Sequence, residues 1–165
     1  MQFSPLTQGL LIKRYKRFLA DITLPDGREV TAHCPNTGSM TGCIEPGWPV
    51  WLSHSDNPKR KLAWTLELVE SPEGMICVHS ALANRIVGEA LERPGLLPFE
   101  AFNDIRSEVR YGKGSRADFL LTGNGGRLYV EVKAVTLHVG DGLGLFPDAV
   151  SDRARRHVEE LIDVV

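Results

Sequence analysis

The sequence predicts an α+β protein with two domains: a small β-barrel over residues 1–80, followed by an α/β domain over residues 81–165. Short β-rich runs separated by turn signals fill the first half. A segment with helical periodicity follows them, and the last third holds three further strand-like runs and a final helix. A chain of 165 residues is long enough to bury one large core or two small ones.

The first half alternates strand signals with turns. FLADITL and REVTAHC flank Pro-Asp-Gly, as is typical of a hairpin, and WTLELVE and MICVH flank SPEG in the same way. Between these pairs, VWLS adds another short strand. About five strands in roughly 80 residues favour a small closed barrel over an open sheet, and a barrel of the oligonucleotide-binding (OB) type is the natural candidate.

The second half changes character. SALANRIVGEALER has apolar residues at a helical period. IRSEVRYG, RADFLL and LYVEVKAVTL then predict three strands in meander order, joined by the turns GKGS and TGNGG. FPDAVSDRARRHVEELIDVV predicts a closing helix, with one apolar stripe formed by Val150, Ala154, Val158, Leu161 and Val165. A meander followed by a helix normally feeds another strand, so we expect this domain to be incomplete at its C-terminal end.

Composition describes a soluble globular protein, with 42% hydrophobic and 24% charged residues. No apolar stretch approaches the roughly 20 residues needed to cross a bilayer, and the N-terminal segment lacks a secretory signal. Cys34, Cys43 and Cys77 are odd in number and lack C-x-x-C spacing, which favours buried thiols in a reducing compartment. We therefore expect a cytoplasmic protein with no membrane partner, of an oligomeric state that the sequence does not indicate.

Basic residues cluster in two runs near the start of the chain. These runs are KRYKR and KRK, which supply Lys13, Arg14, Lys16, Arg17, Lys59, Arg60 and Lys61. Such runs attract a polyanion such as DNA, but they also occur on solvated faces. Only part of the first run can share one face of a strand. Arginine-rich faces with an aromatic residue suit single-stranded or backbone recognition.

Asn124-Gly125 is a strong signal for a two-residue hairpin turn. If the turn forms, Gly123 pairs with Gly126, and the register follows by counting outward. One face then carries only apolar side chains and must contact the core. Its members are Ala117, Phe119, Leu121, Leu128, Val130 and Val132.

On the opposite face, the same register places Asp118 directly across from Glu131, and Arg116 across from Lys133. Two carboxylates about 5 Å apart repel by roughly 3 kcal/mol at an effective dielectric near 20. A fully wetted face tolerates this repulsion, whereas a cleft requires a divalent cation. Two carboxylates suit Mg²⁺, and Lys133 lies where it could orient water or stabilise a phosphoryl transition state. The residues leave both alternatives open.

A third acid often completes such a site. Glu89, on the predicted helix, and Glu108, on the first strand of the meander, are the candidates.

Several motifs together resemble the sugar fermentation stimulation protein A family along the chain from residue 2 onward. They are FLADITLPDG, CPNTGSM, ANR, SEVRYG, SRADFLL, YVEVKAVTL and FPDAV. The resemblance implies an N-terminal OB-like barrel, a C-terminal domain like the PD-(D/E)xK nucleases, DNA binding, and an influence on bacterial sugar utilisation. It places Asp118, Glu131 and Lys133 in the nuclease-like triad, with Arg116 beside them. Ala134 and Ala154 depart from the family pattern, and family members continue with a further strand and helix.

The loop CPNTGSM, residues 34–40, has two interpretations. Asn36, Thr37 and Ser39 either contact a phosphate of the substrate or DNA, or form a tight turn that bonds its own backbone. Arg153, Arg156 and His157 on the last helix could extend the same basic track, although a solvated helix face is the simpler expectation. Three functions remain open: a Mg²⁺-dependent nuclease that binds DNA, a non-catalytic DNA-binding regulator, and a small-ligand or protein-interaction module.

Overall fold

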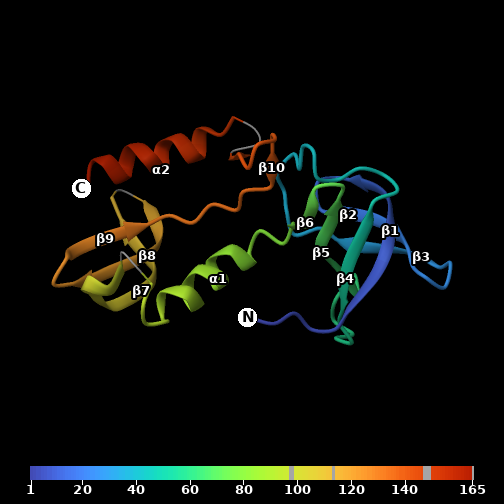
Figure 1. Cartoon of the computed structure of the whole chain (residues 1–165), viewed down its shortest axis with the longest axis horizontal. Coiled ribbons are helices and arrows are strands. Elements are labelled where there is room, and N and C mark those ends of the chain that lie inside the picture. The colour runs from blue at the N-terminus through green and yellow to red at the C-terminus, as the bar shows by residue number, and fades with distance from the viewer. Residues whose placement is uncertain (97–98, 113, 147–149, 165) are drawn as a thin grey trace. The chain divides into compact units, whose positions relative to one another are not determined.

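The computed structural model describes residues 1–96, 99–112, 114–146 and 150–164. The chain forms two compact units (Figure 1). The barrel unit comprises Met1–Ala81 and Ala134–Ala149, and the meander unit comprises Leu82–Lys133 and Val150–Val165. The sequence had assigned every residue after 80 to the second domain, whereas the segment 134–149 groups with the barrel. None of the described helices is both long and apolar enough to cross a bilayer.

Six strands form the sheet of the barrel unit, one more than the five predicted. They are β1 (Leu6–Tyr15), β2 (Leu19–Thr23), β3 (Glu29–His33), β4 (Pro49–His54), β5 (Trp64–Ser71) and β6 (Gly74–Cys77). Their order is β3-β2-β1-β4-β5-β6, and β3 also pairs in parallel with β5, which closes the barrel. Both predicted hairpins are confirmed. Register shifts in the β1–β2 and β4–β5 ladders mark bulges on β1 and β5, which bend strands as a small barrel requires.

The core of the barrel unit is built from alternate residues of these strands. Ile22, Leu52 and Leu66 are fully buried, and two cysteines from the loops, Cys34 and Cys43, are buried with them. All three cysteines of the chain are free thiols. The prediction of buried thiols is therefore confirmed for Cys34 and Cys43, while Cys77 is only partly buried.

The meander unit begins with α1 (Leu82–Leu91) and a short helix η1 (Phe99–Ala101). The three predicted strands follow as β7 (Phe102–Tyr111), β8 (Ser115–Gly123) and β9 (Gly126–Val130), in the order β7-β8-β9. The closing helix is α2 (Asp152–Ile162). In the segment that groups with the barrel, β10 (Leu137–His138) pairs with β11 (Gly144–Leu145).

The Asn124-Gly125 turn forms as predicted. Gly123 pairs with Gly126, and Phe119 pairs with Val130. The face that was expected to contact the core does so, since Ala117, Phe119 and Leu121 are all buried. These observations confirm the predicted register from Gly123–Gly126 to Phe119–Val130, whereas the predicted pairs Asp118–Glu131 and Arg116–Lys133 lie beyond the end of the ladder.

The third strand is shorter than predicted. LYVEVKAVTL was expected to be one strand, but β9 ends at Val130. The N–H group of Val132 donates to Oδ2 of Asp118 at 2.7 Å instead of to a backbone carbonyl of β8. Because this N–H group is bonded to a side chain, it cannot continue the hydrogen-bond ladder of the sheet.

The predicted apolar stripe on the last helix is wrong in part. Val150 is 100% exposed and Val158 is 56% exposed. Among the side chains of α2 that the structure describes, the half-buried ones are instead His157, Glu160 and Leu161, at the spacing of one helical face; the side chain of Ala154, another member of the predicted stripe, is not among those described. Val165 and the FPDAV residues 147–149 lie outside the described residues, as does Lys113 of the GKGS turn.

Candidate functional site

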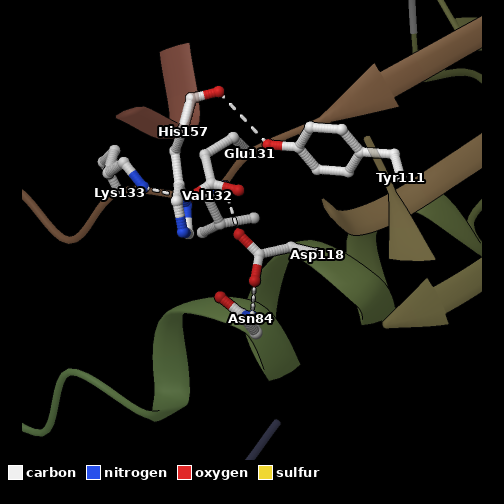
Figure 2. Close-up of polar contacts among 7 residues, drawn as sticks. All are labelled: Asn84, Tyr111, Asp118, Glu131, Val132, Lys133 and His157. Carbon is white, nitrogen blue, oxygen red and sulfur yellow. Dashed lines mark hydrogen bonds and ion pairs between the residues drawn. The ribbon is translucent and has the colours of Figure 1, made fainter. Parts of the chain in front are cut away.

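Asp118, on β8, is held in orientation through both of its carboxylate oxygens (Figure 2). Asn84 Nδ2, on α1, donates to Oδ1 at 2.5 Å, and Val132 N donates to Oδ2 at 2.7 Å. The sequence missed this role of Asn84, although the residue lies in the ANR motif. Hydrogen bonds from two different segments therefore fix the direction of the Asp118 carboxylate.

Glu131 follows directly after the end of β9. Its Oε1 is contacted by Lys133 Nζ and, at 3.4 Å, by His157 Nδ1 of α2. Its Oε2 is buried and has no hydrogen-bond partner among the described residues. The Glu131 side chain is 18% exposed, against 33% for Lys133. A buried carboxylate oxygen without a donor is unusual in a native protein, and it calls for a proton or a cation.

The structure brings the two acids together by a route that differs from the predicted one. They were expected to face each other across a ladder, but the ladder ends one residue before Glu131. Instead, the carboxylate of Asp118 accepts the N–H group of the residue after Glu131. Leu120, on the same face as Asp118, is only 5% exposed, so this face is not the fully wetted surface of the alternative interpretation.

Tyr111 of β7 and Glu160 of α2 are two further groups near the site that the sequence did not predict. Tyr111 Oη donates to the backbone oxygen of His157 at 3.2 Å (Figure 2). Burial raises the pKa of Tyr111, and the negative charges of Glu131, Glu160 and Asp118 raise it further. Glu160 Oε2 is also buried without a partner in the described part of the chain. Three acids therefore surround one phenol, and this local excess of negative charge favours a cation.

The two candidates for a third acid both lie beside Asp118. Glu89 and Glu108 line a surface pocket with it, between α1, β7 and β8. Each already has a cationic partner: Glu89 pairs with Arg93 at 2.5 Å, and Glu108 pairs with Arg116 at 3.1 Å. Within the described residues, no three Asp, Glu, His or Cys side chains are grouped so that they could hold a metal.

The donor set formed by Asp118 and Glu131 fits a hard divalent cation. Mg²⁺ binds oxygen ligands, usually one or two carboxylates together with water or phosphate oxygens. Glu131 Oε2 supplies an oxygen that no described donor occupies, and Asp118 retains a lone pair on each oxygen.

In the barrel unit, Arg14 was predicted to contact DNA, but its guanidinium donates hydrogen bonds to backbone carbonyls of the chain itself. Its guanidinium bonds the carbonyl oxygens of Arg17, Asn36, Gly38 and Ser39. Asn36 Oδ1 accepts the N–H group of Gly38 at 2.9 Å, and Ser39 Oγ lies 2.9 Å from Thr41 Oγ1. These bonds match the tight-turn interpretation of the 34–40 loop, in which Thr37 is exposed.

The remaining predicted DNA contacts are solvent-facing. Lys13 is 63% exposed, pairs with Asp21 at 3.6 Å, and lies 5.5 Å from the centroid of the Tyr15 ring. Lys16 and Arg17 are exposed in the turn that follows β1. The exposed loop before β5 carries Lys59, Arg60 and Lys61. Arg116, in the meander unit, pairs with Glu108.

These features define a two-domain class of protein, in which an OB barrel accompanies an α+β unit with a carboxylate site. Residues 12–78 match the family model described as SfsA N-terminal OB domain, and residues 81–165 match the one described as Sugar fermentation stimulation protein RE domain. The chain belongs to the sugar fermentation stimulation protein family, which confirms the resemblance seen in the sequence.

Individual relatives agree with this assignment. The chain is 56% identical over 164 residues to the sugar fermentation stimulation protein homolog of Marinomonas sp. (strain MWYL1), covering 98% of this chain and 64% of the relative. It is 53% identical to the homolog of Thioalkalivibrio sulfidiphilus, covering 100% of this chain and 70% of the relative. The solved structure of Pyrococcus furiosus SfsA in complex with Ca²⁺ is similar, with a TM-score of 0.85 at 26% identity, over 99% of this chain and 69% of that one.

Proposed function

We propose that this chain binds DNA and that its meander unit hydrolyses phosphodiester bonds with a divalent cation. The observation that carries the proposal is the gathering of Asp118, Glu131 and Lys133, with one Glu131 oxygen buried and lacking a described donor. The related Pyrococcus furiosus protein was solved in complex with Ca²⁺, which is a hard cation like Mg²⁺. We propose Mg²⁺ as the cation of this site.

Each residue of the site has a defined role in this proposal. Asp118 and Glu131 hold the cation, which when bound stabilises the negative charge that develops on the phosphoryl oxygens. Lys133 places its ammonium beside Glu131, where it orients water and neutralises transition-state charge. Asn84 fixes the direction of the Asp118 carboxylate. A bond forms between a water oxygen and phosphorus while one ester P–O bond breaks.

The barrel unit supplies most of the proposed DNA affinity. Its exposed cations are carried by the turn after β1 and by the loop before β5, and the 34–40 loop lies beside the former through the Arg14 bonds. Contacts between cations and phosphates release counterions, so the affinity should fall steeply with salt concentration. The link to sugar utilisation is part of this proposal and would follow from binding at regulated DNA sites.

Cleavage of supercoiled plasmid in Mg²⁺ tests the proposal. Asp118→Asn and Lys133→Met should each reduce the nicking rate by about 100-fold or more, the usual cost of losing a group that stabilises transition-state charge. Glu159→Gln, a change at an exposed helix position, is the matched control and should cleave like the wild-type chain. Mg²⁺-dependent nicking that survives Asp118→Asn would reject the assigned site.

A non-catalytic DNA-binding regulator is the second candidate. It is favoured by the absence of a three-ligand metal group from the described residues and by the pairing of Lys133 with Glu131. Salt-dependent DNA binding without cleavage would select this function. Binding that shows no salt dependence would instead favour a ligand or protein-interaction module.

A further inference from the structure

A row of polar side chains crosses the outer wall of the barrel on three neighbouring strands. Ser53 on β4 pairs with Thr65 on β5, and Thr65 pairs with His33 on β3. Their chain neighbours Leu52 and Leu66 are fully buried in the core. Because side chains alternate along a strand, the row faces away from the core. Thr65 is nevertheless only 5% exposed, so other groups must cover it.

Two basic side chains from other segments contact this part of β5. Arg60, in the loop before β5, donates from Nη2 to Thr65 Oγ1 at 2.7 Å. His79, just after β6, lies with Nδ1 at 2.6 Å from Glu67 Oε2. Arg60 thus contacts the residue that is paired with His33, and His79 contacts Glu67, two residues further along β5. Three basic groups from three segments therefore gather around one stretch of the wall.

Glu67 is the acid of this cluster, and each of its two oxygens already has a partner. It is 6% exposed, its Oε1 accepts from Ser53 Oγ at 2.6 Å, and its Oε2 is bonded to His79. Further along the same wall, Asp21 accepts from Tyr15 and Thr31 and pairs with Lys13. Neither acid has a bond to His33 or to the Arg60 guanidinium among the described contacts.

The electrostatics of His33 follow from this arrangement. Burial lowers the pKa of His33, and the positive charges of Arg60 and His79 lower it further. An anion seated among the three groups would reverse the sign of the local potential and favour protonation of His33. Arg60 uses one of its five N–H donors on Thr65, so its planar fork retains donors for a tetrahedral anion.

We infer that His33, Arg60 and His79 form a subsite for a phosphate group on the outer wall of the barrel. The inference deepens the proposed DNA binding, on which it rests, by naming a backbone phosphodiester as the occupant. Free phosphate and small phosphorylated compounds carry the same chemistry. His33 donates to the anion once protonated, so binding takes up a proton and tightens as the pH falls.

Imidazole NMR of the full chain tests the subsite in two arms, one with inorganic phosphate and one with a short single-stranded oligonucleotide, each at about pH 7.5 and 6.0. The signals of His33 and His79 should shift in both arms. The pKa of His33 should rise on binding, and the affinity should increase several-fold at the lower pH.

Variants test the same subsite through oligonucleotide affinity. Arg60→Gln and His33→Gln should each weaken oligonucleotide binding several-fold. Arg60→Gln should also reduce the slope of log affinity against log salt concentration by about one. His54→Gln, at an exposed position on β4 paired with Asp56, is the matched control.

The outcomes separate this inference from the proposed function. If oligonucleotide binds with a steep salt dependence while His33 and His79 stay unshifted and Arg60→Gln has no effect, the subsite is wrong and DNA binding stands. If phosphate shifts both imidazoles while no oligonucleotide binds at any salt concentration, DNA binding is refuted and the subsite serves a small phosphorylated ligand. Arg60→Lys retains the charge without the fork and should recover only part of the affinity. Native tryptophan fluorescence of each variant verifies that the barrel has folded.

Discussion

The guanidinium of Arg14 holds the 34–40 loop against the barrel, and we predict that its removal destabilises the barrel unit. Nη2 lies 2.6 Å from Arg17 O, 2.9 Å from Asn36 O and 2.8 Å from Gly38 O, and Nη1 lies 3.3 Å from Ser39 O. Nη2 carries two hydrogens, so these three carbonyls share them. The bonds to Asn36 and Gly38 are partly buried, and the other two are exposed.

The magnitude follows from the two partly buried bonds. A hydrogen bond to a charged group contributes about 1.5–3 kcal/mol net, and the exposed bonds add little. Arg14→Ala should therefore lower the free energy of unfolding by about 3 kcal/mol. In a domain of this size, that loss corresponds to a fall in Tm of more than about 10 °C. Arg14→Lys should recover less than half of the loss, because an ammonium cannot reach the same set of carbonyls as a planar fork.

Tryptophan fluorescence during urea unfolding measures the effect in the barrel alone, because all three tryptophans, Trp48, Trp51 and Trp64, belong to that unit. Arg17→Ala removes a neighbouring exposed cation and should change stability by less than about 0.5 kcal/mol. If Arg14→Ala unfolds at the same urea concentration as Arg17→Ala, the reasoning is refuted. A loss of DNA affinity in Arg14→Ala with stability unchanged would show that Arg14 contacts phosphate instead.

Three further outcomes are expected. Gly123→Ala places a methyl group against the backbone around the start of β7 and should destabilise the meander unit by about 1–3 kcal/mol. Hydrogen exchange of β7 and β8 measures this loss. The control is Gly114→Ala, whose methyl group enters open space and should cost far less. The pKa of His33 is lowered in the folded state, so the unfolded chain binds a proton at this residue more readily than the folded chain does. The free energy of unfolding should therefore fall as the pH drops below the ordinary histidine pKa of 6.5. His33→Gln should reduce this dependence on pH, measured by urea unfolding between about pH 7.5 and 5.5. Glu131→Gln removes a negative charge that raises the pKa of Tyr111, so Tyr111 should ionise at lower pH in a spectrophotometric titration. The same change should weaken Mg²⁺ binding at least about tenfold, measured by calorimetry. An unchanged tyrosine titration would contradict the placement of the Glu131 carboxylate.

The elements that could be predicted from the sequence are those whose signals are local. Asn124-Gly125 determines a turn within four residues, and the register of β8 and β9 follows from it. The barrel hairpins and α1 likewise follow from short turn motifs and helical periodicity. Closure of the barrel through the parallel pairing of β3 with β5 was inferred only from strand number, because residues 32 and 64 carry no local sign that they meet.

The parts of the site that escaped prediction come from distant segments. Asn84 contacts Asp118 across 34 positions, and His157 contacts Glu131 across 26 positions. Apolar spacing suggested that α2 would bury its valines, but the half-buried face carries His157 and Glu160. Tertiary contacts outweighed the apolar pattern there. Positions at which the pattern fails in this way are often functional, since a site needs polar groups where packing alone would place apolar ones.

The backbone of β7 is distorted at the position opposite Asp118. Glu108 lies between the pairs Ser107–Phe119 and Val109–Ala117, and is therefore opposite Asp118, yet its φ is 56°. A non-glycine residue in this left-handed conformation costs about 1–2 kcal/mol and persists only where the surrounding structure enforces it. The distortion interrupts the ladder at Asp118, whose carboxylate is then bonded by α1 and by the chain after β9. Asp118 thus lies where the ladder with β7 is interrupted and just beyond the last pair of the ladder with β9, and its carboxylate is fixed there by Asn84 and by the N–H group of Val132.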